Sequence, residues 1–166
     1  MRSTVDTDEG DVLLRRVTSE AERAKQMLLG EIQKLRRFPT GGLEDVPQAP
    51  GVYFVFRTDE VVYVGSSGHG KATDSEGHLR RGLRRRLLME FTRTRLSPIR
   101  RGIAKELNRP RYKPKTKAEK DSALERRINE EVTQLAYAFT LTSSSGSALQ
   151  LERLSIALLQ PGFNRQ

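Results

Sequence analysis

Two adjacent segments rich in β-branched and aromatic residues constrain the fold of this chain more than any other feature. Gly51–Arg57 has the sequence GVYFVFR, and residues 60–66 have the sequence EVVYVGS. Only Thr58 and Asp59 separate the two segments, so the pattern predicts a β-hairpin. Any fold assigned to the chain must therefore contain two antiparallel strands here.

The segments around this hairpin predict helices, loops and one more strand. Ser147 with Gln150 three residues later is a capping-box pattern, which predicts a helix from 147 to 160 that stops at Pro161. Apolar periodicity predicts further helices over 11–37, from about 78 to 92, over 98–107 and over 121–135, a third strand over 136–142, and loops over 67–77 and 108–120.

This order predicts a small α/β domain of mixed type preceded by a helical extension. The length of 166 residues suits one domain with an appendage. We divide the chain into an N-terminal helical extension (1–37), a Pro- and Gly-containing linker (38–50) and the domain itself (51–166). The apolar stripe of the extension is narrow and rich in alanine, so it can lie across the domain or pair with another chain as a homodimer.

Composition excludes several classes of protein and site. The chain has no cysteine, which rules out disulfide scaffolds, thiolate metal sites and thiol nucleophiles, and fits a cytoplasmic setting (nucleoid-associated if the source is bacterial). It has two histidines, so a metal would be a hard cation held by carboxylate oxygen. No apolar run is long enough to span a membrane, and the acidic N-terminus is unlike a signal peptide.

Positive charge is concentrated in one quarter of the chain. Residues 80–117 contain fifteen Lys and Arg against Glu90 and Glu106, a local net of 15 − 2 = +13, whereas the rest of the chain sums to 9 − 13 = −4. Such a block favours a polyanionic partner, and we favour nucleic acid over a membrane surface. The expected contacts are Arg80, Arg81, Arg84, Arg85, Arg93, Arg95, Arg100, Arg101, Lys113 and Lys115.

Two charged residues fall on the apolar side of predicted helices. On a wheel of about 100° per residue, Glu152 lies within the arc of apolar residues of the last helix. A carboxylate there needs a cation, an arginine or access to solvent at the edge of the domain. Arg86 lies on the flank of the apolar stripe of the basic helix, where it can reach the surface of the sheet, and Arg80 faces inward as well.

In combination, these residues resemble the GIY-YIG nuclease superfamily. The triplets are Gly51-Val52-Tyr53 and Tyr63-Val64-Gly65, each differing from the family name by Ile to Val. Arg86, Glu152 and the segment Pro161-Gly162-Phe163-Asn164 follow in the family's order, so the resemblance spans roughly residues 50–165.

The resemblance implies a three-stranded antiparallel sheet flanked by helices, with one active site on a face of the sheet. It implies hydrolysis of DNA phosphodiester bonds with one divalent cation. Glu152 would hold Mg²⁺ or Mn²⁺, whose charge stabilises the transition state. Tyr53 would be the general base, aided by a nearby cation and arginine that favour its ionised form. Tyr63 would position water or phosphate, Arg86 would bind the scissile phosphate, and Asn164 would orient an oxygen ligand.

The basic helix departs from the family pattern of Leu-x-x-Arg-Leu with a histidine four residues after the arginine. One register places Gly82 at the arginine position. The other keeps Arg86 and places Glu90 at the histidine position, and we prefer it. His69 or His78, in a longer loop than is usual for the family, would then be the source of an imidazole.

The two tyrosines set a geometric condition. A strict two-residue turn would place Tyr53 and Tyr63 on opposite faces of the hairpin, because side chains alternate along a strand. The catalytic pairing that the resemblance implies needs both tyrosines on one face. We therefore predict either a turn with an odd number of residues or a β-bulge.

The function expected on these grounds is a metal-dependent DNA endonuclease with catalytic residues Tyr53, Tyr63, Arg86, Glu152 and Asn164 and no membrane partner. Two alternatives stay open: a DNA-binding module whose nuclease site has decayed, and a basic RNA-binding protein. Charge alone does not choose between DNA and RNA.

Overall fold

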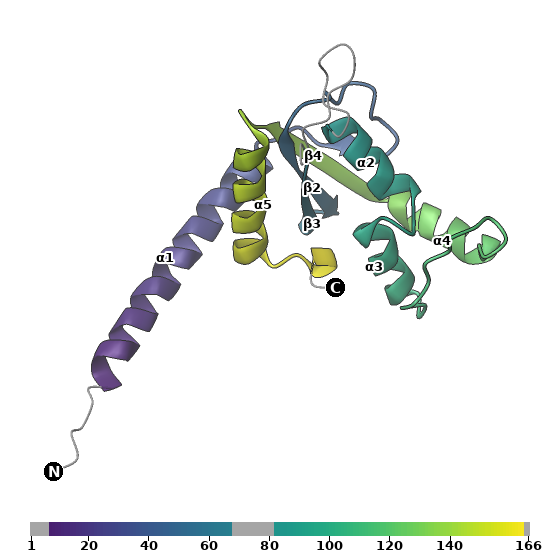
Figure 1. The fold of residues 1–166 in the computed structure, drawn as a ribbon. Coiled ribbons are helices and arrows are strands. Elements are labelled where there is room, and N and C mark those ends of the chain that lie inside the picture. The colour runs from purple at the N-terminus through teal and green to yellow at the C-terminus, as the bar shows by residue number, and fades with distance from the viewer. Residues whose placement is uncertain (1–6, 68–81, 165–166) are drawn as a thin grey trace.

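The computed structural model describes residues 7–67 and 82–164 and places an antiparallel sheet between two layers of helices (Figure 1). The strands are β1 (Phe38–Pro39), β2 (Gly51–Arg57), β3 (Glu60–Ser67) and β4 (Leu135–Leu141). They lie in the order β1-β4-β2-β3, so β1 and β3 form the two edges. The helices are α1 (Thr7–Gln33), α2 (Leu83–Thr92), α3 (Pro98–Glu106), α4 (Ser122–Thr133), α5 (Ser145–Leu159) and the short 3₁₀ helix η1 (Gly162–Asn164).

The structure confirms the mixed α/β class. The sheet has four strands in the described residues, whereas three were expected. The segment predicted as a linker contains β1, where Phe38 pairs with Tyr137 and Pro39 pairs with Ala136. Phe38 stacks on Tyr137 with ring centroids 5.5 Å apart, so an aromatic contact fixes the short strand. A proline is tolerated there because an edge strand does not need every backbone N–H for the sheet.

Each face of the sheet has its own hydrophobic core. On one face, residues of α1 and α5 pack against Val52, Phe54 and Phe56 of the central strand. On the other face, residues of α2, α3 and α4 pack against Tyr53 and Val55. Side chains alternate between faces along a strand, so the near-continuous burial of β2 follows from helices on both sides.

Helix α1 extends well beyond the body of the domain, as Figure 1 shows. It begins and ends four residues earlier than the predicted helix over 11–37. Its last turn tightens, since Lys34 N donates to Glu31 O and Leu35 N donates to Ile32 O. The end near Ile32 packs on α5, whereas the preceding turns leave their apolar residues exposed.

The remaining boundaries agree with the sequence to within a few residues, apart from one cap. Helix α5 begins after Ser144, whose hydroxyl accepts a hydrogen bond from Ser147 N at 3.1 Å. Ser147 is thus inside the first turn and is not the N-cap, so the capping box predicted on Ser147 and Gln150 is wrong. Within the described residues, no helix is long and apolar enough to cross a membrane.

Candidate active site

A β-bulge in β3 places Tyr53 and Tyr63 on the same face of the sheet. Arg57 pairs with Glu60 across a two-residue turn, in which Thr58 adopts a positive φ of 56°. The register then shifts: Phe56 pairs with Val61, but Val55 pairs with Tyr63. The extra residue in β3 puts the Tyr63 side chain on the same face as Tyr53. With a two-residue turn and no bulge, the two side chains would lie on opposite faces. The predicted bulge is confirmed, and the tyrosine rings lie 6.1 Å apart.

The glycines of the two triplets are explained by close packing, of Tyr53 over Gly65 and of strand β4 against Gly51. Tyr53 pairs with Gly65 across the hairpin and lies over it. A Cβ atom on Gly65 would be 2.3 Å from the Tyr53 hydroxyl oxygen, and one on Gly51 would be 2.5 Å from Thr140 O. Neither position has room for a side chain. The glycine of the second triplet therefore follows from the way in which Tyr53 is buried, whereas the glycine of the first follows from the approach of the β4 backbone.

Helix α2 brings Arg86 and Glu90 to the hydroxyl group of Tyr53. Arg86 Nε donates to the Tyr53 hydroxyl at 3.2 Å, and this hydroxyl donates to Glu90 Oε1 at 3.1 Å. Arg86 Nη2 also pairs with Glu90 Oε1 at 2.7 Å, as residues four apart on a helix can. The three side chains thus form one closed network. It favours the register that keeps Arg86, with Gly82 at the N-cap of α2.

The three members of this network differ in their exposure. Tyr53 is fully buried, and Glu90 is 1% exposed. The Arg86 side chain is 35% exposed, so part of its guanidinium group faces outward. Arg86 is therefore the member that a phosphate can reach first, and Tyr53 and Glu90 lie behind it.

Burial makes both tyrosines weak acids. Burial raises the pKa of Tyr53 well above 10, and the charge of Glu90 raises it further, while Arg86 opposes the shift. Burial likewise raises the pKa of Tyr63 to about 12, with Glu90 again adding to the effect. Arg86 does favour the ionised form of Tyr53, as expected of a neighbouring arginine, but the net shift of the pKa is upward. The desolvation of a phenolate outweighs the attraction of one partly solvated cation.

Glu90 has a shifted pKa for the same reason. Burial raises the pKa of the Glu90 carboxyl above 4.5, and the ion pair with Arg86 opposes the shift. A carboxylate with a raised pKa is a stronger base than an exposed one and is therefore a better acceptor for a proton from Tyr53.

Glu152 approaches the tyrosines from the other layer of helices. It lies on α5, half-buried, and its Oε2 accepts a hydrogen bond from Ser66 Oγ of β3. Since β3 is an edge strand, a residue on α5 can reach the edge that Tyr63 occupies. The charge of Glu152 is close enough to raise the pKa of the Tyr63 hydroxyl. The structure thus brings Tyr53, Tyr63 and Arg86 into one cluster on the α2 side of the sheet, and it places Glu152 with Ser66 on the α5 side of the same edge strand.

Asn164 is held by the backbone of the same edge strand. Its Nδ2 donates to Val64 O at 2.8 Å, and its Oδ1 accepts from Val64 N at 2.8 Å. Both polar groups of the side chain are engaged, so Asn164 fixes the C-terminal segment onto β3 beside Tyr63. In this conformation it acts on the position of the strand, and the role expected for it toward an oxygen ligand stays a prediction.

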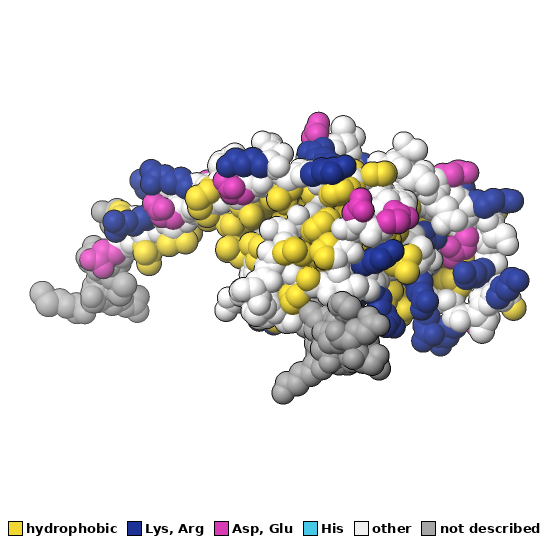
Figure 2. Space-filling model, turned by 90° about the horizontal axis from the view of Figure 1, so that it is seen from above, with side chains coloured by type: hydrophobic (Ala, Val, Ile, Leu, Met, Phe, Trp, Pro, Cys, Tyr) yellow, Lys and Arg dark blue, Asp and Glu magenta, His cyan; other side chains and the backbone are white. Residues whose placement is uncertain are grey.

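The predicted DNA-contacting residues divide into four groups, of which the last is the buried Arg100. Arg80 and Arg81, like His69 and His78, lie outside the described residues. Figure 2 shows Lys and Arg side chains gathered at the end of the molecule away from α1. Arg101 is half-buried and donates to Arg95 O. The exposed members are Arg84, Arg85, Arg93, Arg95, Lys113 and Lys115.

Arg100 does not belong to this surface, and its prediction as a DNA contact is wrong. It is 1% exposed. Its guanidinium group donates to the Thr94 hydroxyl, to Phe91 O, to Glu125 Oε2 and to Asn129 Oδ1, each at 2.8 Å. These bonds join α3 to α4 and to the end of α2, so Arg100 is a buried structural residue.

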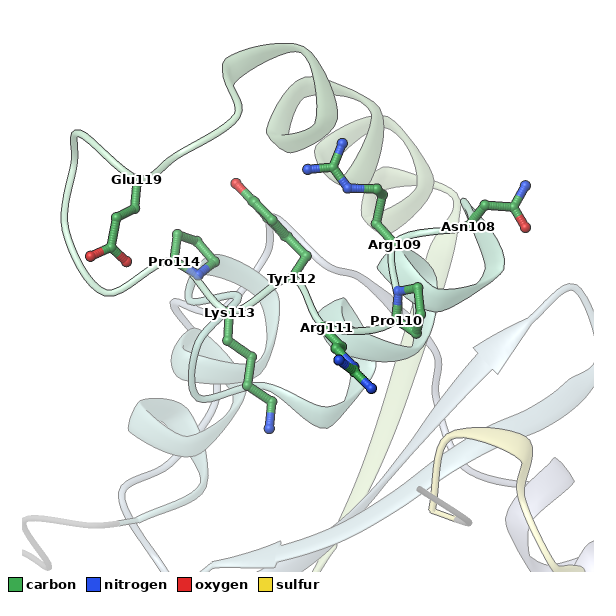
Figure 3. A pocket seen from close by; sticks show the side chains of 8 residues that line it. All are labelled: Asn108, Arg109, Pro110, Arg111, Tyr112, Lys113, Pro114 and Glu119. Carbon is green, nitrogen blue, oxygen red and sulfur yellow. The ribbon is translucent and has the colours of Figure 1, made fainter.

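The basic loop after α3 forms a pocket of about 420 Å³ (Figure 3). The Arg109 guanidinium lies 5.9 Å from the centre of the Tyr112 ring, and it also pairs with Asp121. The Tyr112 hydroxyl donates to Glu125 Oε1. In Figure 3, Arg111 and Lys113 point to the opposite side from Arg109 and Tyr112. Arg109 and Tyr112 therefore brace the loop, while Arg111 and Lys113 are exposed and suited to contact phosphate.

The donor set at Glu152 fits a magnesium-like ion. Among the described residues, no group of three His, Cys, Asp or Glu side chains gathers around one point. Mg²⁺ does not need such a cage, because it keeps several waters and binds through one or two carboxylates together with substrate phosphate. One half-buried carboxylate beside an arginine-containing cluster meets that requirement.

Sequence reasoning missed two members of this site. Glu90 was noted as a departure at a histidine position and was not assigned a role, although its spacing of four residues from Arg86 on one helix could have indicated the ion pair. Ser66 was assigned only to the strand. Its contact with Glu152 depends on how α5 crosses β3, for which the sequence carries no signal.

No family model matches the chain, and the search of curated proteins finds no similar sequence.

Proposed function

We propose that the protein is a divalent-metal-dependent endonuclease that hydrolyses DNA phosphodiester bonds. The observation that carries this proposal is the bulge in β3, which gathers Tyr53 and Tyr63 on one face beside Arg86. A hairpin built only for packing has no need to place two tyrosines, an arginine and a buried glutamate in one polar cluster. The resemblance of these residues to the GIY-YIG nuclease superfamily supports the same reaction.

Arg86 binds the phosphate in this proposal. Its Nε and one Nη atom are held by Tyr53 and Glu90, so the guanidinium plane is fixed while its outer part is accessible. A fixed guanidinium suits the two-point recognition of phosphate oxygens and neutralises the charge that develops in the transition state. The exposed residues of the basic block extend this electrostatic surface along the DNA.

Glu152 is the residue that would hold the cation. Bound there, Mg²⁺ or Mn²⁺ supplies positive charge to the reacting phosphate. Ser66 fixes the Glu152 carboxylate by donating to Oε2. This bond orients the side chain at the edge of β3, as hydrogen bonds from neighbouring residues do for other metal ligands.

Tyr53 transfers the proton of the attacking water without becoming a free phenolate. Because burial raises its pKa, Tyr53 passes its own proton to Glu90 while it accepts one from water. The water oxygen forms the new bond to phosphorus, the bond to the leaving sugar oxygen breaks, and that oxygen takes a proton from solvent. Glu90 then returns its proton to solvent, which restores the starting state and closes the proton balance. Tyr63 lies beside Tyr53 and orients the water by its hydroxyl group.

A DNA-binding module without cleavage is the second candidate. It is favoured by one observation: Tyr53 is fully buried, and its hydroxyl already has both a donor and an acceptor. A group in that state must become accessible on substrate binding to act on water. The two candidates agree on the DNA-binding surface and differ in turnover.

Glu152→Gln separates the two. We expect the variant to bind duplex DNA as the wild type does in the absence of metal and to lose cleavage in Mg²⁺ or Mn²⁺ by about 10²-fold or more. Glu130→Gln, an exposed position on α4, is the matched control and should cleave normally. Equal rates for wild type and Glu152→Gln contradict the assigned metal ligand. A wild type that binds without cleaving supports the second candidate, and preference for RNA in competition at fixed salt contradicts both.

A further inference from the structure

We propose that residues 10–27 of α1 form a parallel two-stranded coiled coil with the same residues of a second copy of the chain. This part of α1 projects from the domain, as Figure 1 shows, and the pairing does not depend on the nuclease activity. The inner end of the helix is covered by its own domain, where Leu28 and Ile32 pack with α5 residues. The outer turns have no such cover.

The outer turns expose a large apolar surface. Leu13, Leu14 and Val17 are 62%, 65% and 57% exposed. Leaving such side chains in water forgoes the free energy of burying them, and contiguous apolar surface of this kind is typical of an interaction site. In Figure 2, hydrophobic side chains follow one side of this helix, and Lys and Arg side chains follow the other.

The spacing of the apolar residues identifies the partner as another helix. Leu14, Val17, Ala21 and Ala24 alternate at steps of three and four, which is the a/d pattern of a heptad repeat, and Leu28, the next position of this stripe, packs on the domain itself. At about 100° per residue these five positions fall within roughly 80° of each other. The alanines at the inner positions allow close approach of two helix axes, and Leu14 and Val17 provide the larger apolar contacts farther out.

The charges beside this stripe favour a second copy in parallel orientation. With Leu14 and Ala21 at position a, Glu20 falls at g and Lys25 at e. In a parallel pair, a g residue faces the e residue of the next heptad in the partner, so each Glu20 meets the Lys25 of the second copy. An antiparallel pair centred on Glu20 would instead bring the two Glu20 side chains together. The ion pair from Arg23 to Glu20 within the helix is compatible with the parallel arrangement.

The absence of cysteine gives a direct test in the full chain. Leu14→Cys introduces a single thiol at an a position, and a parallel pair places the two thiols opposite each other. Under mild oxidation we expect a disulfide-linked dimer in good yield. Arg15→Cys, one residue along and outside the stripe, is the matched control and should yield at least tenfold less linked dimer.

Mass measurement supplies the second readout. Light scattering of the wild type at tens to hundreds of micromolar should approach twice the chain mass of 18.8 kDa, and Leu14→Asp with Val17→Asp should restore 18.8 kDa. Because both aspartates lie in the exposed turns, circular dichroism should show a folded domain. A wild type that is monomeric throughout this range overturns the proposal. A dimer that Leu14→Cys does not cross-link, or that the aspartates leave intact, overturns the parallel pairing through α1.

Discussion

The Tyr53 hydroxyl donates a hydrogen bond to Glu90 Oε1 at 3.1 Å, and this bond is buried between the sheet and helix α2. This bond links a hairpin strand to helix α2 and gives Tyr53 a carboxylate as its immediate proton acceptor. Arg86 contacts both groups and is the one member of the three that is substantially exposed. In the proposed mechanism, this bond lets Tyr53 take part in proton transfer although burial makes it a weaker acid.

The four tyrosines give a spectroscopic test of this environment. The pKa values of Tyr63 and Tyr137 are raised to about 12, mainly by burial, and burial also raises those of Tyr53 and Tyr112. We expect absorbance at phenolate wavelengths to stay flat to about pH 9 in the folded protein, with Tyr53, Tyr63 and Tyr137 ionising only at higher pH or when alkali unfolds it. A tyrosine that ionises below pH 9 in the folded protein would contradict the arrangement around Tyr53.

Replacing Glu90 separates proton transfer from phosphate binding. Glu90→Gln keeps the shape of the side chain and an acceptor for Tyr53 but cannot take up a proton. We expect kcat to fall by about 10²-fold or more, with DNA affinity within about twofold of wild type. The acidic limb of the pH–rate profile should also flatten, since the group that titrates is gone. An unchanged rate and profile would show that Glu90 has no part in the reaction.

The same variant should change how stability depends on pH. Burial raises the pKa of Glu90 in the folded protein, so between about pH 4.5 and that raised pKa the folded state binds more protons than the unfolded state. The contribution of Glu90 to stability is therefore full below pH 4.5 and declines as the pH rises. In urea unfolding, Glu90→Gln should gain stability relative to wild type from pH 4.5 to 7.5. A constant difference across this range would contradict the raised pKa.

Gly65 tests the packing that underlies the triplets. Gly65→Ala introduces a Cβ atom where the Tyr53 hydroxyl lies, so either the ring or the strand must move. We expect a loss of about 1–3 kcal/mol in the free energy of unfolding, as for other overpacked sites, together with a loss of cleavage. Gly146→Ala, whose added Cβ would meet its nearest atom at an ordinary 3.7 Å, is the control and should be neutral or stabilising. A neutral Gly65→Ala would show that Tyr53 does not lie over Gly65 in solution.

We expect Arg100 to contribute to the stability of the fold and Arg93 to contribute to DNA binding. Arg100→Lys keeps the charge but cannot satisfy the four acceptors of Arg100, so we expect the free energy of unfolding to drop by about 3 kcal/mol. The DNA affinity of the folded fraction should not change. Arg93→Ala, on the exposed surface, should leave stability within about 0.5 kcal/mol and reduce the salt dependence of DNA binding. The reverse pattern would place Arg100 at the DNA interface.

Local patterns in the sequence predicted the hairpin and most of the helices. The resemblance required Tyr53 and Tyr63 to share a face, and because side chains alternate along any strand, this required either a turn with an odd number of residues or a bulge. The edge strand β1 could not be predicted, because two residues in a proline-containing segment carry no periodicity. It forms through the contact of Phe38 with Tyr137, some hundred residues later in the chain.

The sequence predicted which residue types form the candidate site, but it predicted less well which of the charged residues are buried. Tyr53, Tyr63 and Arg86 come together as the resemblance implied. On a wheel of about 100° per residue Glu90 falls between Arg86 and Leu83, on the apolar side of α2, so its burial could have been predicted and was missed. Charge counting alone assigned Arg100 to the DNA-contacting residues, although the packing of α3 on α4 buries it.

The most direct test of the central claim is a cleavage assay on supercoiled and branched DNA with purified full-length protein. Reactions contain Mg²⁺, Mn²⁺ or a chelator, and a gel resolves nicked and linear products. The account predicts metal-dependent nicking by the wild type that is abolished by the chelator and lost in Arg86→Ala. Retention of intact DNA by the wild type at every metal concentration, under conditions in which the protein binds that DNA, would contradict it.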